Sequence, residues 1–564
     1  MKLYPPLYES LKDWPIYKFA QRREEFIREL DAYTLKHFET LSAERLKEIL
    51  LQTAYLEKQR IKKDSWKIDP PQEENFWNKV QHKANEVSLE NEIEAKKELL
   101  HFVEVIVNRY SQEIVGGFKI ATFKFMRKFL TWLFHRLLNT ARTKSLKGLF
   151  TNKHQLYEKL RVSGQDLPLI RESCKDGTLV IVPTHFSNLD SILVGYAMDA
   201  VLGLPAFLYS AGLNLFNYGI PAYFMNRLGA YRLDRRKRNH IYLQTLKSMS
   251  EYALIQDINS LFFAGGTRSR SGELESRLKL GLLGTTISAQ RKLYAKGSDR
   301  KIFIAPLIIS YNFVLEGKHL IHQFLKAEGK EKYSYTKDKS HKIRHILNFI
   351  WCLFRRDSEI VLSFAPVIDV LGNRVKSGGI SIDQQGQEVD IKQYFVGENG
   401  IEAHKQREEI YTKRLSESIL ASYRKYNIVL PSHLLSFVAF EALMRKFEHL
   451  DFYQVLHLSS EEAVLEYKKF EQLVTSIRNI LLEKAANGEL LLHHKITEGV
   501  GECIQSGLED IGIYHPQKPI SKTRDNKIVS QDITLLYYYR NRLNEYGLEK
   551  DMQVILDKEA KTIE

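Results

Sequence analysis

One strand–loop–helix unit, at residues 179–201, constrains the fold of this chain more than any other stretch. Residues 179–182 are all aliphatic, and they predict a buried strand that ends at Pro183. A helical stretch follows from residue 190 to about residue 201. In open α/β sheets, functional residues lie beyond the carboxyl ends of strands, so the loop between these two elements is where we expect chemistry.

His185 lies on this loop, and Asp190 stands at the start of the helix. On one continuous helix, residues five apart would point about 140° away from each other, but a chain that folds back through a loop brings them together. A carboxylate on one imidazole nitrogen fixes the tautomer and leaves the other nitrogen free to take a proton from an alcohol. On spacing alone, a structural histidine beside a helix-start carboxylate is the better explanation, and the rest of the sequence reverses that preference.

Besides the loop that carries His185, a second polar loop follows a short apolar strand predicted at residues 261–263. Its glycines let backbone N–H groups approach an anion, its arginines bind phosphate oxygens in a forked geometry, and its hydroxyls add donors. We therefore predict a phosphate-binding loop that contains Gly266, Thr267, Arg268, Ser269 and Arg270. The alternatives are a solvated turn and a basic loop that contacts nucleic acid, but no RNA-binding or helix-turn-helix pattern lies nearby.

The charge balance agrees with an anionic partner. The 564 residues include 83 Lys and Arg against 69 Asp and Glu, which gives a net charge of +14. Such a balance suits a phosphorylated substrate, a membrane surface or nucleic acid, although ordinary solubility also explains it. The first residues lack the apolar core of a signal peptide. The sequence has no uninterrupted run of about 18 apolar residues, so we expect no membrane-spanning helix.

Cysteine and histidine usage gives no sign of a metal site. Cys174, Cys352 and Cys503 are too far apart in the sequence for a metal-binding or disulfide framework. His493 and His494 are adjacent but have no Cys or carboxylate cluster beside them, so we interpret them as structural. We expect no bound metal.

Strand-like and helix-like segments alternate through the middle of the chain. This pattern predicts an α/β fold with a mostly parallel sheet and flanking helices, between helical N-terminal and C-terminal domains. Further strands are expected at residues 302–310 and 359–364, and a loop-rich region at residues 211–214. We predict three domains, at residues 1–110, 111–400 and 401–564.

Two stretches, residues 116–138 and 345–356, are dense in aromatic and aliphatic residues and interrupted by Lys and Arg. Basic amphipathic helices of this kind suit an interfacial position on anionic lipid. The alternative is a pair of helices packed against a neighbouring domain, with their basic residues on a solvated rim. The first stretch fits both interpretations equally, and the presence of a second favours the membrane.

Together these motifs resemble those of the glycerophospholipid acyltransferase superfamily. T-H-F-S-N-L-D is similar to its H-x-x-x-x-D motif, and G-T-R-S-R-S-G is similar to its phosphate-binding motif. The order of motifs is most similar to that of the membrane-bound bacterial glycerol-3-phosphate acyltransferases, with a second motif around residues 211–215 and 227–231 and a fourth at residues 306–311. The resemblance spans about residues 110–545.

The resemblance implies a role for each motif. His185 would deprotonate the acceptor hydroxyl with Asp190 orienting it, and the alkoxide would attack an acyl thioester on coenzyme A or acyl carrier protein, without a further cofactor. The polar loop and Arg235 would hold the acceptor phosphate. Other residues would line the acceptor pocket or the acyl side of the cleft: Asn214, Arg227, Arg232, Asp234, Arg236 and Pro306.

Two positions depart from the family pattern. The family has Glu before Gly-Thr-Arg, where Gly265 stands here, and its second motif ends in two arginines, where Asp234 and Arg235 stand here. We hypothesise that Asp234 supplies the carboxylate that Gly265 lacks. Arg232 and Arg236 would replace the missing arginine.

The resemblance therefore implies a glycerol-3-phosphate 1-O-acyltransferase in the first step of phospholipid synthesis, peripheral or monotopic on the cytoplasmic face of the cell membrane. Three alternatives remain. The same chemistry would act on dihydroxyacetone phosphate or lysophosphatidate, the chain would be an inactive lipid-binding protein on the same fold, or it would bind nucleic acid. The last rests on charge alone, and we expect no nucleic-acid partner. The oligomeric state is open.

Overall fold

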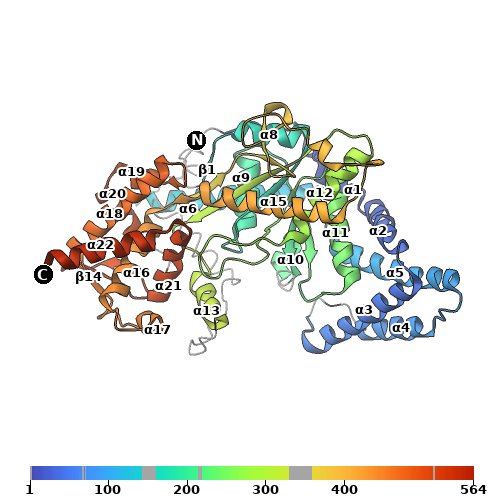
Figure 1. The fold of residues 1–564 in the computed structure, drawn as a ribbon, viewed down its shortest axis with the longest axis horizontal. Coiled ribbons are helices and arrows are strands. Elements are labelled where there is room, and N and C mark those ends of the chain that lie inside the picture. Colours follow the sequence, from blue (N-terminus) through green and yellow to red (C-terminus); the bar gives the residue numbers. More distant parts are fainter. Residues whose placement is uncertain are drawn as a thin grey trace.

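The computed structural model describes residues 3–66, 69, 72–142, 160–213, 219–328, 359–511 and 515–563. N-terminal helices, a central sheet and C-terminal helices lie side by side along the long axis of the molecule (Figure 1). Asn214, Cys352 and the basic stretch expected at residues 345–356 lie outside the described residues. None of the helices in the described ranges is both long and apolar enough to cross a membrane.

The N-terminal region is helical, as expected. Its helices are η1 (Leu11–Asp13), α1 (Pro15–Gln21), α2 (Arg23–Glu39), α3 (Ala43–Lys63), α4 (Glu73–Glu86), α5 (Glu92–Ile114) and α6 (Ile120–Arg142). Ser42 and Asn91 are the N-cap residues of α3 and α5, and their side chains accept N–H groups of the first turn. Helices α2, α3 and α5 pack against α11 (His240–Ile255) and share a hydrophobic core with it, so this region is joined to the sheet domain rather than set apart from it.

Ten strands within the described residues form one sheet, in the order β10–β9–β8–β6–β2–β5–β3–β4, with β7 beside β6 and β1 beside β7. Strands β6, β2, β5, β3 and β4 are parallel to one another, whereas β7 and β8 run antiparallel to β6. The predicted mostly parallel sheet is therefore confirmed. The strands are β1 (Leu160–Gly164), β2 (Thr178–Pro183), β3 (Leu208–Gly212), β4 (Ala230–Leu233), β5 (Ser260–Leu261), β6 (Ile302–Tyr311), β7 (Ile360–Phe364), β8 (Ile368–Asp369), β9 (Arg374–Lys376) and β10 (Ile380–Ile382).

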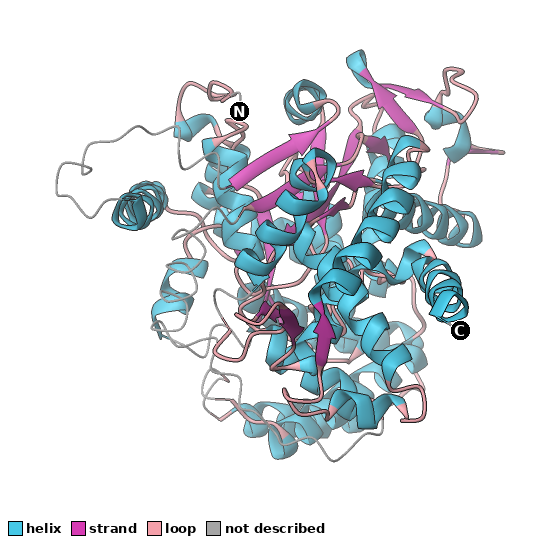
Figure 2. Cartoon of the chain, turned by 90° about the vertical axis from the view of Figure 1, so that its left-hand side faces the viewer, coloured by secondary structure: helices cyan, strands magenta, loops and turns pink. Residues whose placement is uncertain are grey.

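Helices cover both faces of this sheet (Figure 2). All residues of β2 and β6 are buried, which is why both strands read as nearly continuous apolar runs in the sequence. Besides α11, the covering helices and their close neighbours are α8 (Leu167–Asp176), α9 (Asp190–Ala200), α10 (Gly219–Met225), α12 (Leu280–Ala295), α13 (Gly317–Ala327) and α15 (Lys405–Lys425).

The C-terminal region packs onto the same core as the sheet. Its main helices are α16 (Pro431–Lys446), α17 (Phe452–Leu456), α18 (Tyr467–Ala486), α19 (His494–Glu498), α20 (Val500–Ile511), α21 (Ile533–Arg540) and α22 (Leu548–Ile563). The remaining short elements are η4 (Ser377–Gly379), η5 (Ile391–Phe395), β11 (Val396–Gly397), β12 (Gly400–Ile401), β13 (Ile428–Val429), β14 (Val464–Glu466), β15 (Leu491–Leu492), β16 (Ser521–Lys522), β17 (Lys527–Val529) and η6 (Asn541–Tyr546). Buried His433 on α16 contacts the carbonyl of Tyr311 at 3.2 Å, which ties this region to the end of β6.

The structure corrects the loop expected at residues 211–214. Ala211 and Gly212 are the last residues of β3, where Ala211 pairs with Arg232 of the parallel strand β4. The stretch Leu-Tyr-Ser-Ala-Gly has little β-propensity, and its pairing with β4 and β5 decides its conformation.

Two ion pairs on α3 provide a test of how the N-terminal region is stabilised. The side chains of Arg60 and Glu57 are 3% and 1% exposed, whereas those of Arg45 and Glu48 are 53% and 62% exposed. We predict that Arg60→Met lowers the free energy of unfolding by about 3–5 kcal/mol, because the buried Glu57 and Glu73 would each lose an ion pair. Arg45→Met is the matched control and should cost less than about 1 kcal/mol. Equal losses in urea unfolding would contradict this account.

Candidate active site

Three loops that follow parallel strands meet at one edge of the sheet. His185 follows β2, and Arg235 follows β4. The loop that contains Gly266, Thr267, Arg268, Ser269 and Arg270, here called the glycine–arginine loop, follows β5. Because neighbouring parallel strands end at the same edge, the sheet brings these distant parts of the sequence together. The backbone N–H of Ser269 donates to the carbonyl oxygen of His185 at 2.7 Å, which joins two of the loops directly.

His185 and Asp190 are in contact, as the sequence predicts. The Asp190 carboxylate lies 2.8 Å from His185 Nδ1, so Nδ1 carries the proton and Nε2 is the basic nitrogen of the neutral ring. Nε2 has no hydrogen-bond partner among the described residues, and the His185 side chain is 16% exposed. The ring stacks on Phe263, with 4.0 Å between the ring centroids. The geometry suits a general base whose Nε2 is available to accept a proton from a substrate.

Asp190 does more than orient the ring. Its Oδ2 also accepts the backbone N–H groups of Phe186 and Ser187, at 2.7 and 2.9 Å, and its Oδ1 accepts the hydroxyl of Tyr311. Asp190 is fully buried, so these donors replace the water that the carboxylate has lost. Burial and the negative charge of Asp190 raise the pKa of Tyr311 well above its ordinary value, which keeps this hydroxyl protonated as a donor.

Glu316 is a second buried carboxylate at this loop, and the sequence analysis missed it. It accepts the Ser187 hydroxyl at 2.9 Å and the Asn188 N–H at 3.0 Å. It also lies 3.1 Å from the guanidinium of Arg268, so this predicted phosphate ligand is ion-paired within the protein. Burial raises the pKa of Glu316, an effect that the charge of Arg268 opposes. Its position 129 residues after Ser187 left no local signal in the sequence.

Glu275 is the third carboxylate and was also missed. Its Oε1 accepts the backbone N–H of His185 at 2.8 Å, and burial raises its pKa to about 7. It lies directly against Gly265, since a Cβ added to Gly265 would come within 2.9 Å of Glu275 Cγ. The carboxylate beside Gly265 is therefore that of Glu275, and the hypothesis that Asp234 fills this place is wrong.

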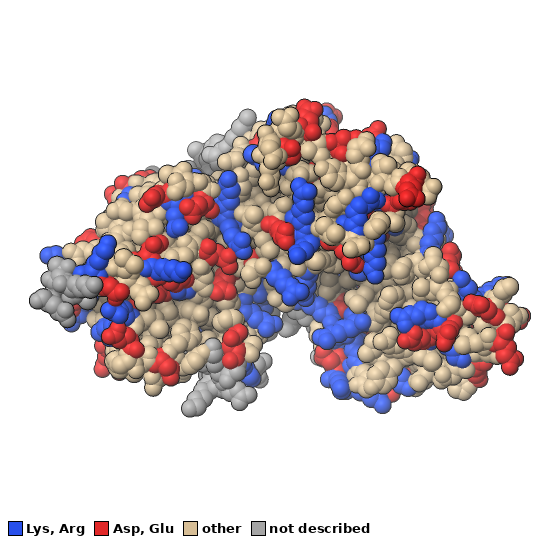
Figure 3. Space-filling view, viewed as in Figure 1, with Lys and Arg blue, Asp and Glu red and all other residues tan. Residues whose placement is uncertain are grey.

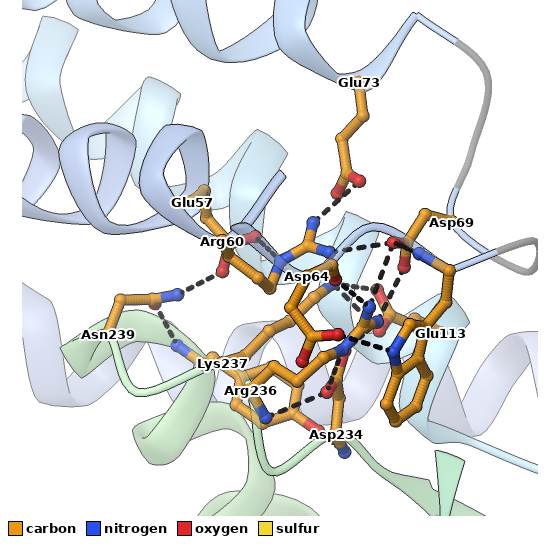
Figure 4. Close-up of polar contacts among 12 residues, drawn as sticks. Glu57, Arg60, Asp64, Asp69, Glu73, Glu113, Asp234, Arg236, Lys237 and Asn239 are labelled. Carbon is orange, nitrogen blue, oxygen red and sulfur yellow. Dashed lines mark hydrogen bonds and ion pairs between the residues drawn. The ribbon is translucent and has the colours of Figure 1, made fainter. Parts of the chain in front are cut away.

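Asp234 instead belongs to a network with the N-terminal helices (Figure 4). Its carboxylate accepts from the backbone N–H and the guanidinium of Arg236, and that guanidinium also binds Asp69 and stacks on Trp66. Nearby, the Lys237 ammonium is paired with Glu113 at 2.6 Å. Arg236 is fully engaged in this network, so the expectation that it replaces a phosphate-binding arginine is also wrong.

Arg235 lies near the arginines of the glycine–arginine loop. Burial and then the positive charges of Arg268 and Arg270 lower its pKa, which shows that the three guanidinium groups are close enough to repel one another. Arg235 and Arg270 have no ion pair among the described residues. In this part of the chain, Glu316 pairs with Arg268 alone, so the cluster keeps an excess of positive charge, which favours the binding of an anion.

Lys279 adds a fourth cation, which the sequence analysis did not identify. A Cβ on Gly266 would lie 2.7 Å from Cε and 3.0 Å from Nζ of Lys279, so the lysine side chain passes directly over this glycine. Gly266 has φ of 78°, a left-handed conformation that favours glycine. Lys279 is the N-cap residue of α12 and lies 13 residues after Gly266, outside the sequence motif.

The remaining predicted residues are less tightly gathered. Thr267 and Arg270 are exposed on the loop, while the Ser269 hydroxyl donates to the carbonyl of Glu273 and thereby shapes the loop itself. Arg227 stacks on Tyr223, and Arg232 donates twice to Asn226. Pro306 is buried in β6 opposite Val182, next to the strand that carries His185. Asn214 lies outside the described residues.

One cluster outside this site, at the start of β7, has metal-ligand character. Glu359, His493 and His494 place one possible donor atom each within 4.8 Å of the others, so His493 does have a carboxylate partner, at 3.2 Å, that the sequence analysis did not find. The guanidinium of Arg161 lies 3.1 Å from His494 Nδ1, and its positive charge disfavours the binding of a metal cation there. We interpret the cluster as a polar contact that joins the C-terminal region to the start of β7.

Comparison with known proteins bears directly on this site. Residues 153–310 match the family model described as Acyltransferase, a segment that contains both polar loops. The chain is 25% identical over 246 residues to a glycerol-3-phosphate acyltransferase of Pseudomonas paraeruginosa. This alignment covers 43% of this chain and 26% of that protein. The chain is 26% identical over 228 residues to the enzyme of the same name from Shewanella amazonensis, covering 40% of this chain and 25% of that protein.

The match to these relatives is partial: the aligned part of the chain spans about a quarter of their length. The family model nevertheless covers β1 to β6 together with His185, Asp190 and the glycine–arginine loop. Residues 153–310 of this chain are therefore similar to acyltransferase domains.

Proposed function

We propose that this protein transfers a fatty acyl group from a thioester to a hydroxyl of glycerol-3-phosphate, with His185 as the general base. The observation that carries the proposal is the arrangement around His185. Its Nδ1 is held by Asp190, its Nε2 has no partner among the described residues, and the loop bonded to its carbonyl carries a cluster of cations. The names of the relatives support the acceptor.

The proposed reaction needs no covalent enzyme intermediate. His185 Nε2 takes the proton of the acceptor hydroxyl as the oxygen attacks the thioester carbonyl. The buried Asp190 carboxylate stabilises the imidazolium that forms. When the tetrahedral intermediate collapses, the C–S bond breaks, and the imidazolium returns its proton to the leaving thiolate. The products are the acyl ester and the free thiol of coenzyme A or acyl carrier protein.

The acceptor phosphate is proposed to bind between Arg235, Arg270 and Lys279, above the backbone of Gly266. None of these three has an ion pair with a carboxylate of the described residues, whereas Arg268 is paired with Glu316. Figure 3 shows further Lys and Arg side chains on both sides of the concave edge between the two ends of the molecule. Such a charge distribution favours the approach of an anionic substrate.

Helix α6 is proposed to lie on the cytoplasmic surface of the membrane. Phe125, Phe129 and Trp132 form one stripe along it and are 57%, 37% and 58% exposed, with exposed Lys124 and Lys128 beside them. The opposite side is attached to α9 through the ion pair of Arg127 with Asp199 and a hydrogen bond between Thr131 and Tyr196. The exposed stripe argues against the alternative of a helix whose aromatic face is packed within the protein.

Replacing the base should abolish acyl transfer. We predict that His185→Ala lowers kcat/KM by about 10²–10⁴ because proton abstraction is lost. His82→Ala is the control: His82 also pairs with a carboxylate, Glu86, but on an exposed helix far from the sheet. Purified protein is assayed with labelled glycerol-3-phosphate, dihydroxyacetone phosphate and lysophosphatidate, and with both thioester donors. No product from any acceptor, or unchanged activity in His185→Ala, would refute the proposed function.

Removing one phosphate-binding cation should weaken acceptor binding and leave the chemical step nearly intact. Arg235→Ala and Arg270→Ala are each expected to raise KM for glycerol-3-phosphate about tenfold, because a charge-assisted hydrogen bond is lost. Steady-state kinetics with the acyl donor at saturation measure this. Arg374→Ala, an exposed arginine on β9, should leave KM unchanged. A fall in kcat at constant KM would place the phosphate elsewhere.

Membrane binding should depend on the aromatic stripe. We predict that the triple variant Phe125→Ser, Phe129→Ser and Trp132→Ser binds anionic vesicles at least about tenfold more weakly, since three apolar side chains no longer enter the interface. A matched variant, Tyr55→Ser with Ile93→Ser, removes exposed apolar residues from α3 and α5 and should bind normally. Vesicle sedimentation measures both. Equal binding by the two variants would argue against an interfacial α6.

A further inference from the structure

We propose that Glu275 is a positioning residue for His185, and that Gly265 is glycine because the Glu275 side chain occupies the space beside it. The proposal extends the function proposed above by naming what holds the loop of the base in place. Glu275 does not contact the imidazole, and it acts through the backbone of the loop.

The contact between Glu275 and the loop is direct. Glu275 Oε1 accepts the N–H of His185 at 2.8 Å, and its Oε2 is buried without a hydrogen-bond partner in the described part of the chain. No other acceptor is recorded for this N–H among the described residues. Without Glu275, a backbone donor beside the base would be left unsatisfied in a region shielded from water.

Gly265 is required by space rather than by backbone conformation. Its φ is not in the left-handed range, so an L-residue would adopt this backbone without strain. A Cβ at this position, however, would lie 2.9 Å from Cγ and 3.3 Å from Oε1 of Glu275. The two residues therefore exclude each other: a side chain at position 265 displaces Glu275 from the place where it binds the loop.

Glu275 completes a regular pattern of carboxylate contacts. The four successive N–H groups of residues 185–188 donate to Glu275, to Asp190 twice and to Glu316. These carboxylates come from three separate parts of the chain, so the loop is held from three directions. Asp190 and Glu316 bind the N–H groups of residues 186–188 and Asp190 also binds the His185 ring, whereas Glu275 binds the backbone N–H of the residue that carries the base. A displacement of the base by about 1 Å is enough to cost most of its catalytic effect.

The pattern predicts how substitutions behave. Glu275→Gln keeps an oxygen that accepts the His185 N–H and should retain activity within about threefold, whereas Glu275→Ala should lower kcat at least about tenfold with little change in acceptor KM. Gly265→Glu should have a lower kcat than the wild-type protein, because the new side chain and that of Glu275 compete for the same space. The double variant Gly265→Glu with Glu275→Ala should recover most of the lost kcat, because the new carboxylate enters the vacated place.

Hydrogen–deuterium exchange tests the same idea without any turnover. In Glu275→Ala, the amides of the segment around residues 184–187 should exchange about tenfold faster, and Glu275→Gln and the double variant should restore protection. Glu273→Ala is the control, since this neighbouring carboxylate contacts Asn544 and Ser271 rather than the base loop.

The two measurements separate the two proposals. If wild-type protein acylates no acceptor, the proposed function fails, and exchange still decides the role of Glu275. Unchanged exchange in Glu275→Ala, or a Gly265→Glu variant that the second substitution does not rescue, would overturn the positioning role.

Discussion

The buried carboxylate of Asp190 is the interaction on which the active edge of this protein depends. It binds the imidazole of His185, two successive backbone N–H groups and the hydroxyl of Tyr311. A carboxylate that is fully removed from water is costly unless all of its acceptor sites are used, and here four donors use them. The same set of bonds fixes the tautomer of the base, the turn that follows β2 and the start of α9.

The surroundings separate charge in a way that suits the proposed chemistry. Three carboxylates, Asp190, Glu275 and Glu316, lie on the side of the loop that faces the protein. Cations that lack a described partner, Arg235, Arg270 and Lys279, belong to the glycine–arginine loop and its neighbours. The N–H of Ser269 bonds the glycine–arginine loop to the carbonyl of His185, so the base and this loop belong to one site. Arg268 joins the two sides through its ion pair with Glu316.

Much of this arrangement was predictable because it is local in sequence. The aliphatic run before Pro183 and the helix after Asp190 gave the strand–loop–helix unit, and β6 with its neighbours followed from apolar runs of the same kind. The parallel sheet then required the loops after β2 and β5 to meet. The contacts that sequence reasoning missed are made by residues outside the motifs. No periodicity or spacing in the sequence marks Glu275, Glu316 or Lys279. Only the tertiary fold, which brings these residues next to the two loops, shows their roles.

Asp234 shows why reasoning from a motif alone misplaces a residue. It stands where an arginine was expected and carries a carboxylate, which Gly265 lacks, yet that carboxylate binds Arg236, which in turn binds Asp69 of the N-terminal region. The most direct test of the account is to identify, by mass spectrometry, the product that purified protein forms from acyl-coenzyme A and glycerol-3-phosphate. The account predicts a mono-acylated glycerol-3-phosphate that appears with the wild-type protein and not with His185→Gln. Free fatty acid alone, or the same product from both proteins, would contradict it.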